Sequence, residues 1–301
     1  KIIGRIYPVF GAILLFSAVG VFFGLLVQGY PLLNVWDDWN GGLIKYGDYF
    51  GANHFIPIFF ITVACGILSG FHSTQTAIIS RTMKSEKQGH TTFYRMMTLE
   101  GFIAMIWAAA GMAIYNLQPE LMQVNATSAL KAITTHFLGN ILSSLTIIGI
   151  IVLAITSGDT AMRSLRLSLG EILNIQQKSF KNRIMLCLPL IVIVAALLWW
   201  SNLSAASFSN LWNYFAWGNQ VLAASTLLAG TVWLHHQNKI SWIAAVPAAF
   251  MVFIVVSYIL WVSPEKGGPA GLGLSLGVAY IIAGISAILA LIWTYRRKAN
   301  F

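Results

Sequence analysis

The chain has 301 residues, of which 57% are hydrophobic and only 9% are charged, and its mean hydropathy is +0.75. Soluble domains carry about 25% charged residues, so this composition excludes an ordinary soluble protein and predicts an integral membrane protein. The net charge of +9 does not indicate nucleic-acid binding, because no nucleic-acid motif accompanies the basic residues.

A membrane-spanning helix needs about 20 mostly apolar residues, and about eight segments of the chain meet this requirement. In chain order they are residues 6–30, 55–80, 93–115, 138–156, 184–200, 211–234, 242–262 and 274–295. The sixth segment is the weakest, because it is interrupted by Trp212, Asn213, Asn219 and Gln220. The second is long enough to be broken into two pieces. The sequence therefore predicts an all-α polytopic membrane protein, with residues 1–301 forming a single transmembrane domain.

The positive charges alternate between the segments that link these spans. With the N-terminus placed inside, the inner segments hold 15 of the 18 Lys and Arg residues, and the outer segments hold only Lys45, Lys131 and Lys266. This asymmetry follows the positive-inside rule, so we expect both ends of the chain to be cytoplasmic. Residues 159–183 form a basic cytoplasmic segment, whose apolar residues near helical spacing favour a position along the inner interface.

Glycines, hydroxyl groups, a histidine and a glutamine crowd the second span between Gly66 and Thr76. Such groups are costly at membrane depth unless they line a cavity or pair with one another, and a helix broken there is typical of a transporter's substrate or ion site. The predicted substrate-binding residues in this stretch are Ser69, His72, Ser73, Thr74 and Gln75. Two interpretations of the histidine stay open, a pathway residue that takes a proton and a neutral side chain satisfied by a neighbouring helix.

Two carboxyl groups at membrane level are candidates for proton coupling. Glu100 lies seven residues into the third span, which is about 10 Å at the rise of an α-helix. The alternative is a structural partner for a buried hydroxyl or for Arg95. Asp159 ends the fourth span, where it can relay protons or coordinate a cation. The alternative there is a helix N-cap that pairs with Arg163.

Two adjacent amides, Asn219 and Gln220, interrupt the sixth span. Amides in lipid need hydrogen-bond partners, so these side chains face the substrate path or join two helices. Both interpretations stay open, and we count the two residues among the candidate substrate-binding residues.

Enzyme motifs are missing from the sequence. There is no HExxH, no pair of membrane-level aspartates and no Walker A motif, so we expect no enzymatic activity, and any transport would be driven by a gradient. We expect no cofactor and no metal site. Cys65 and Cys187 lie in apolar runs without ligand-like spacing, which predicts no disulfide.

Four blocks, at residues 58–75, 97–107, 156–164 and 218–224, follow one another in a recognisable order and spacing. The first reads IFFITVACGILSGFHSTQ and is the longest and most specific. In these blocks, across about residues 55–230, the chain resembles the carbon starvation protein A family.

The resemblance implies an uptake carrier of the bacterial inner membrane that is induced on nutrient depletion. Family members are described as peptide transporters or as proton-coupled pyruvate transporters. The family is grouped with amino acid–polyamine–organocation carriers, which implies a LeuT-like fold of inverted five-helix repeats with broken helices. Nothing in this chain matches the family's N-terminal membrane region, so we expect the chain to be its C-terminal portion, with half of the substrate site missing.

The leading hypothesis is a secondary active transporter for pyruvate or peptides. Its expected partners are the small-molecule substrate, a proton or sodium as coupling ion and membrane lipids, with no nucleic acid. A nutrient sensor or scaffold without transport activity is the alternative, and a membrane-embedded enzyme is weaker still. A sensor should tolerate substitution of Glu100 and Asp159, whereas a symporter should not.

Overall fold

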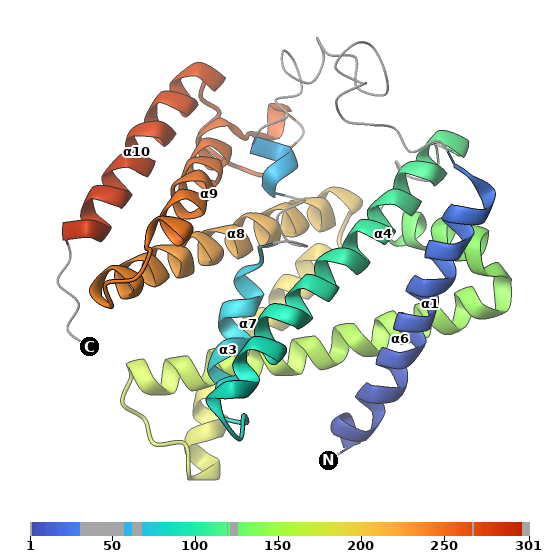
Figure 1. Ribbon diagram of the computed structural model, residues 1–301, viewed down its shortest axis with the longest axis horizontal. Helices are drawn as coiled ribbons and strands as arrows, with labels where there is room; N and C mark the ends of the chain where they lie inside the picture. Colours follow the sequence, from blue (N-terminus) through green and yellow to red (C-terminus); the bar gives the residue numbers. More distant parts are fainter. Residues whose placement is uncertain are drawn as a thin grey trace. The chain divides into compact units, whose positions relative to one another are not determined.

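The computed structural model describes residues 2–30, 57–61, 68–118, 120, 126–266 and 268–296. The predicted outer segment 31–54, Cys65 and the extreme ends lie outside these residues. Within the described ranges the chain is helical and contains no strand, as the predicted all-α class requires. The helices drawn in Figure 1 are α1 (Ile2–Gln28), α3 (Gly70–Ser80), α4 (Met96–Leu117), α6 (Ala126–Ile172), α7 (Phe180–Ser201), α8 (Ala205–His236), α9 (Trp242–Trp261) and α10 (Leu276–Arg296).

Six helical stretches of the described chain are long and apolar enough to cross a membrane. They are residues 8–28, 86–115, 128–172, 180–201, 242–261 and 276–296. The expectation of eight spans is therefore not confirmed. Helix α3 has only 11 residues, and α8 has 32 but carries amide and hydroxyl side chains that lower its hydropathy. The six stretches make the protein a multi-pass membrane protein.

The chain divides into two compact units. Unit 1 comprises residues 1–46 and 83–161, and unit 2 comprises residues 47–82 and 162–301. The core of unit 1 lies where α1 and α4 meet the first part of α6, and it consists of Val21, Ile106, Ala110, Ile114 and Ile133. Beside this core the hydroxyls of Ser17 and Thr146 lie 2.7 Å apart, so a buried hydrogen bond joins α1 to α6.

Helix α6 is two helical segments joined at a bend, which Figure 1 shows in green. Gly139 adopts φ 73° and ψ 173° at the bend, a conformation that side chains strongly disfavour. The hydroxyls of Thr134 and Ser143 lie 2.7 Å apart and form a buried hydrogen bond across it. A glycine thus divides α6 at the point where the fourth span was predicted to begin.

Unit 2 is built on the packing of α8, α9 and α10. Helices α9 and α10, orange and red in Figure 1, run side by side. Ile254, Tyr258 and Ala279 form the centre of the buried core, and Ile61 joins them from residues 57–61. The indole nitrogen of Trp217 on α8 donates to the carbonyl of Val255 on α9 at 2.9 Å. A side chain therefore uses a backbone oxygen to tie two helices together.

The connection between α9 and α10 is held by Lys266. Its ammonium donates to the carbonyls of Trp261 at 2.9 Å, Gly273 at 3.2 Å and Leu274 at 2.9 Å, and it lies 5.4 Å from the centre of the Trp261 ring. A cation at the C-terminal end of α9 also satisfies carbonyls that the helix leaves without intrahelical donors. Lys266 is therefore a structural element of this connection.

Apolar side chains cover the outside of the bundle, most completely on α7. Ile191, Val192, Ile193 and Leu198 are all exposed on this helix, on more than one side of it. In water such a surface would be an aggregation site, whereas in a bilayer it faces acyl chains. The surface of α7 is thus consistent with a position at the lipid boundary of unit 2.

Candidate functional site

Within the second predicted span, a helix starts directly after Ser69. This residue is extended, with φ −119° and ψ 134°, and α3 starts at Gly70 directly after it. The Ser69 hydroxyl accepts a hydrogen bond from the backbone N–H of Phe71 at 3.2 Å, as an N-cap residue should. Residues 57–61 are helical, while 62–67 lie outside the described part of the chain. A helix therefore begins inside the segment that was predicted to be broken.

Asn219 of α8 completes the cap of α3. Its side-chain oxygen accepts from the Ser69 hydroxyl at 3.1 Å and from the N–H of Phe71 at 3.1 Å. Asn219 is 9% exposed, so both hydrogen bonds are shielded from solvent. The N-terminal N–H group of α3 that an anionic substrate would approach is thus already bound by protein oxygens.

Gly70 brings α3 into direct contact with α8. A Cβ at this position would lie 2.3 Å from the backbone oxygen of Asn219 and 2.7 Å from the Cβ of Leu222. Real Cβ atoms do not approach other atoms so closely, so only glycine fits without a displacement. The contact explains why the polar stretch contains a glycine where α3 begins.

Gln220 links α8 to the segment before the break. Its side chain is fully buried, and its amide nitrogen donates to the carbonyl of Ile61 at 3.4 Å. Asn219 and Gln220 therefore contact the two sides of the break, Asn219 the start of α3 and Gln220 residues 57–61. These contacts are of the kind expected for amides that join helices, and the predicted contact with substrate stays a prediction.

The hydroxyls on α3 donate to backbone carbonyls of their own helix. Ser73 donates to Gly70 at 2.7 Å, Thr74 to Phe71 at 2.9 Å, and Thr76 to the carbonyl of residue 72 at 2.7 Å. Hydroxyls in membrane helices satisfy their protons in this way when no other acceptor is near. The crowding of polar groups at this level is thus compatible with a folded helix.

His72 and Gln75 are half-buried on α3. The Nδ1 atom of His72 is itself buried. The structure brings His72, Ser73, Thr74 and Gln75 onto one short helix whose start is fixed by Ser69, and Asn219 and Gln220 contact the same region from α8. All seven predicted substrate-binding residues therefore belong to unit 2 and to one neighbourhood of it.

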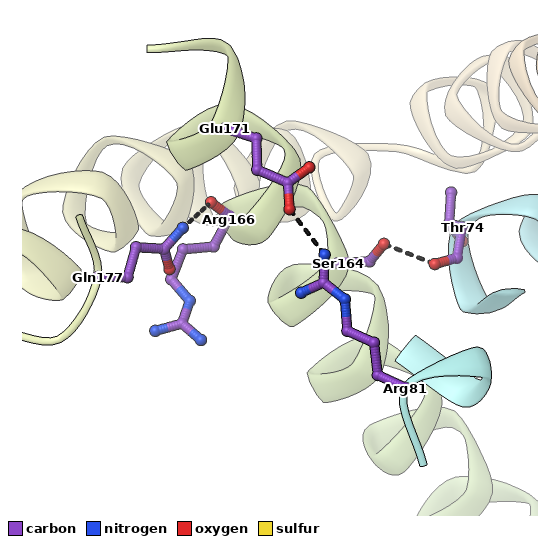
Figure 2. Close-up of polar contacts among 6 residues, drawn as sticks. All are labelled: Thr74, Arg81, Ser164, Arg166, Glu171 and Gln177. Atoms are coloured by element: carbon purple, nitrogen blue, oxygen red, sulfur yellow. Dashed lines mark hydrogen bonds and ion pairs between the residues drawn. The ribbon is translucent and has the colours of Figure 1, made fainter. Parts of the chain in front are cut away.

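The later turns of α3 are fastened to the second part of α6. The Ser164 hydroxyl donates to the carbonyl of Thr74 at 2.7 Å, and the Arg81 guanidinium pairs with Glu171 at 2.8 Å (Figure 2). The ion pair is open to solvent, with both side chains about 60% exposed or more, so its contribution to stability is small. Ser164 lies in the third of the four sequence blocks, but the sequence pattern of that block did not predict its contact with Thr74.

Glu100 and Asp159, the predicted proton carriers, belong to unit 1. Glu100 lies on α4 and lines a cavity of about 440 Å³ with Leu14 of α1 and Ile150 of α6. It is the only ionisable residue among those that line the cavity, which is otherwise almost wholly apolar. Asp159 is exposed within the part of α6 that belongs to unit 1, and it lies inside the helix rather than at its start. The N-cap alternative for Asp159 is therefore wrong.

The described residues contain no group of three or more His, Cys, Asp or Glu side chains that could hold a metal ion. His235 and His236 at the end of α8 lie with ring centres 6.0 Å apart, and His235 packs on Tyr295.

A family model for the carbon starvation protein CstA matches residues 10–146 and 121–258, which together cover most of the chain. The chain belongs to the CstA family. The resemblance seen in the four sequence blocks is thereby confirmed.

Two relatives from Haemophilus influenzae strain Rd share 40% identity with the chain. One is an uncharacterized membrane protein, aligned over 134 residues, or 41% of this chain and 36% of the relative. The other is an uncharacterized protein, aligned over 119 residues, or 40% of this chain and 82% of the relative. The chain thus spans about a third of the length of the first relative. No solved structure matches the chain.

Proposed function

We propose that this CstA-family chain forms part of a secondary active transporter that imports a small carboxylate, such as pyruvate, or peptides, coupled to protons. The observation that carries the proposal is the helix start at Ser69 and Gly70, capped by Asn219 of α8, inside a multi-pass membrane protein. Discontinuous helices with polar side chains at their ends are where such carriers bind substrate. The name of the family, which refers to carbon starvation, suits an uptake role.

In this proposal the substrate lies against α3, where His72 and Gln75 supply an imidazole and an amide. Ser69 and Asn219 hold the start of the helix and give it a fixed position. Because these two residues already bind each other, their first role is positioning, and they reach substrate only if their hydrogen bonds exchange. Gln220 holds residues 57–61 in the same way.

Glu100 is the proposed proton carrier with the stronger structural support. Glu100 is exposed on α4 at an otherwise apolar cavity of unit 1, and a carboxyl on a membrane helix is the kind of group through which transporters move protons. Asp159 is the second candidate, supported by its position on a membrane helix. The inner membrane of a bacterium, with both ends of the chain cytoplasmic, is the proposed setting, and the distribution of basic residues supports it.

Uptake into proteoliposomes tests the proposal. The full-length protein is reconstituted, an inward proton gradient is imposed, and accumulation of labelled pyruvate and of a labelled dipeptide is measured. We expect gradient-dependent accumulation of one substrate, lost in Glu100→Gln and reduced at least tenfold in His72→Ala. Glu86→Gln, which changes an exposed carboxylate outside the candidate site, is the matched control and should transport normally.

Two results would contradict the proposal. Folded, inserted protein that accumulates neither substrate would exclude both substrates and favour a sensor. Normal coupled uptake by Glu100→Gln would remove Glu100 from the coupling mechanism and leave Asp159 as its candidate.

A further inference from the structure

A second cavity lies in unit 1, where α4 ends and α6 begins. Its volume is about 480 Å³, and its lining residues are Gln118, Ser128, Lys131, Ala132, Thr135 and His136. Five of these six side chains are polar, and none is acidic. Glu120 is close in sequence, but it is exposed and is not part of the lining. The cavity thus combines an ammonium, an imidazole, two hydroxyls and an amide.

The first segment of α6 places these groups on one side. Ser128, Lys131 and Thr135 follow one another at spacings of three and four residues, which align side chains along a helix face. The segment ends at the bend of Gly139, and the Thr135 hydroxyl lies 3.1 Å from that of Ser143 beyond the bend. The lining groups are therefore held by a short, anchored piece of helix.

His136 is held by Tyr30, the second residue after α1, which is not among the residues that line the cavity. The Tyr30 hydroxyl forms a hydrogen bond with Nε2 of His136, and the two rings pack edge to face with centres 5.6 Å apart. Tyr30 also packs on Phe137, with ring centres 5.5 Å apart. The Tyr30 hydroxyl donates to Oε1 of Gln28 and therefore accepts from Nε2–H of His136, so the imidazole is fixed at the edge of the cavity.

Lys131 supplies an uncompensated positive charge. Among the residues that the structure describes, the ammonium of Lys131 makes neither an ion pair nor a hydrogen bond, whereas the ammonium of Lys266 donates to three carbonyls. Lys131 is also one of only three Lys or Arg residues in the segments predicted to face outward. A charge that the positive-inside rule disfavours at this location, next to a polar cavity, indicates a role in binding.

We propose that this cavity binds a small anion through its carboxylate or phosphate group. Lys131 provides the charge, Thr135 and Ser128 provide hydroxyls, and the amide of Gln118 provides a further donor. Charge-assisted hydrogen bonds to such groups are the strongest that side chains offer. The volume lies within the range of small-molecule sites. The anionic group belongs to a free solute or to the headgroup of an acidic lipid, which share this chemistry.

Binding of inorganic phosphate to the purified full-length protein tests the site by isothermal titration calorimetry. We expect binding that is at least tenfold weaker in Lys131→Gln and absent in Lys131→Glu, since the charge-assisted contacts are lost. Lys239→Gln removes a matched exposed lysine after α8 and should bind phosphate as the unmodified protein does. Raising the salt concentration should weaken the binding that depends on Lys131.

A second arm separates the two sources of the anion. The protein is placed in nanodiscs of phosphatidylcholine alone or with phosphatidylglycerol, and retained lipid is counted by native mass spectrometry. A headgroup site predicts phosphatidylglycerol retained by the unmodified protein, lost in Lys131→Glu and competing with phosphate. A solute site predicts phosphate binding that is equal in both nanodiscs.

Equal phosphate binding and equal lipid retention in the unmodified protein and in Lys131→Glu would overturn the proposal. This outcome is separate from the transport test, because the cavity shares no residue with the proposed substrate site. His72→Ala should leave phosphate binding unchanged even if it abolishes uptake.

Discussion

Asn219 shows how a single side chain fixes the start of a helix. Its one oxygen receives two hydrogen bonds, from Ser69 and from the N–H of Phe71, at a level where water is scarce. Removing that oxygen takes away the acceptor of the Ser69 hydroxyl and leaves the N–H of Phe71 with the Ser69 oxygen alone. Buried polar groups in this position cost more than the average hydrogen bond contributes.

Replacing Asn219 with leucine should therefore destabilise unit 2. We expect a loss of about 1–3 kcal/mol, seen as a lower thermal unfolding midpoint of the detergent-solubilised full-length protein. Asn210→Leu is the matched control on the same helix, because the side chain of Asn210 makes no hydrogen bond within the described ranges. Equal unfolding midpoints for the two variants would contradict the role assigned to Asn219.

Gly70→Ala tests the contact between α3 and α8 by adding one methyl group and changing no polar group. The added Cβ would meet the backbone of Asn219 at 2.3 Å, so α3 must move or the variant must carry strain. We expect a cost of about 1–3 kcal/mol and a clear loss of uptake. Gly218→Ala is the control, since nothing lies within 4 Å of the added Cβ. Full stability and uptake in Gly70→Ala would contradict the requirement for glycine at this contact.

At the scale of elements, α6 is the helix whose course departs most from the sequence prediction. The expected span of residues 138–156 is the middle of a 47-residue helix that continues through the predicted basic segment to Ile172. Hydropathy marks the apolar stretch only, because the flanking turns are polar and are helical through their packing and hydrogen bonds. The bend at Gly139 divides this helix without ending it.

Gly139→Ala measures the energetic cost of the backbone conformation at the bend, separately from any steric clash. Nothing lies within 4 Å of the added Cβ, so any loss of stability comes from the disfavoured φ and ψ. We expect about 1–3 kcal/mol, measured as a lower unfolding midpoint. Gly158→Ala on the same helix has equally open surroundings and ordinary helical backbone, and it should be neutral or slightly stabilising. Identical unfolding midpoints for the two variants would mean that the backbone at the bend can change to a conformation that suits alanine without loss of stability.

Each α-helix named above overlaps a span that local sequence patterns predicted, and the start of α3 falls inside the predicted break. Hydropathy and glycine spacing report such features because they depend on residues close in sequence. The contact of Asn219 with Ser69 joins residues 150 positions apart, so the open choice between substrate contact and helix contact needed the structure. The cavity at Lys131 was missed for the same reason, although its lysine was already unusual among the predicted outer segments.

At the scale of the whole molecule, the sidedness of the connections follows from how many helices cross the membrane. Helices α7, α8 and α9 separate Lys178 from Glu265, so the two positions lie on opposite sides if all three cross. Helix α8 is the one in question, because it is not among the six apolar stretches. Its packing against α9 and α10 nevertheless favours a crossing.

Cysteine labelling checks this arrangement. In a version of the full-length protein without its native cysteines, Glu265→Cys should react with an impermeant maleimide in intact cells. Lys178→Cys should react only after the membrane is opened. Labelling of both from the same side would show that α8 does not cross, and reversed labelling would overturn the cytoplasmic placement of the chain ends.

The hydroxyls of α3 have one more consequence, which concerns the polarity of the surface they present. Ser73 and Thr76, three residues apart and therefore on one side of α3, each donate their proton to a carbonyl of the helix, which leaves oxygen lone pairs on the outer surface of that side. As it stands, this face suits a ligand that brings its own hydrogen, such as an ammonium or a protonated acid. An ionised carboxylate would first require hydroxyls to rotate away from their carbonyls. In a carrier that takes up an acid together with its proton, the acid would reach α3 protonated, which is the form that this face can bind.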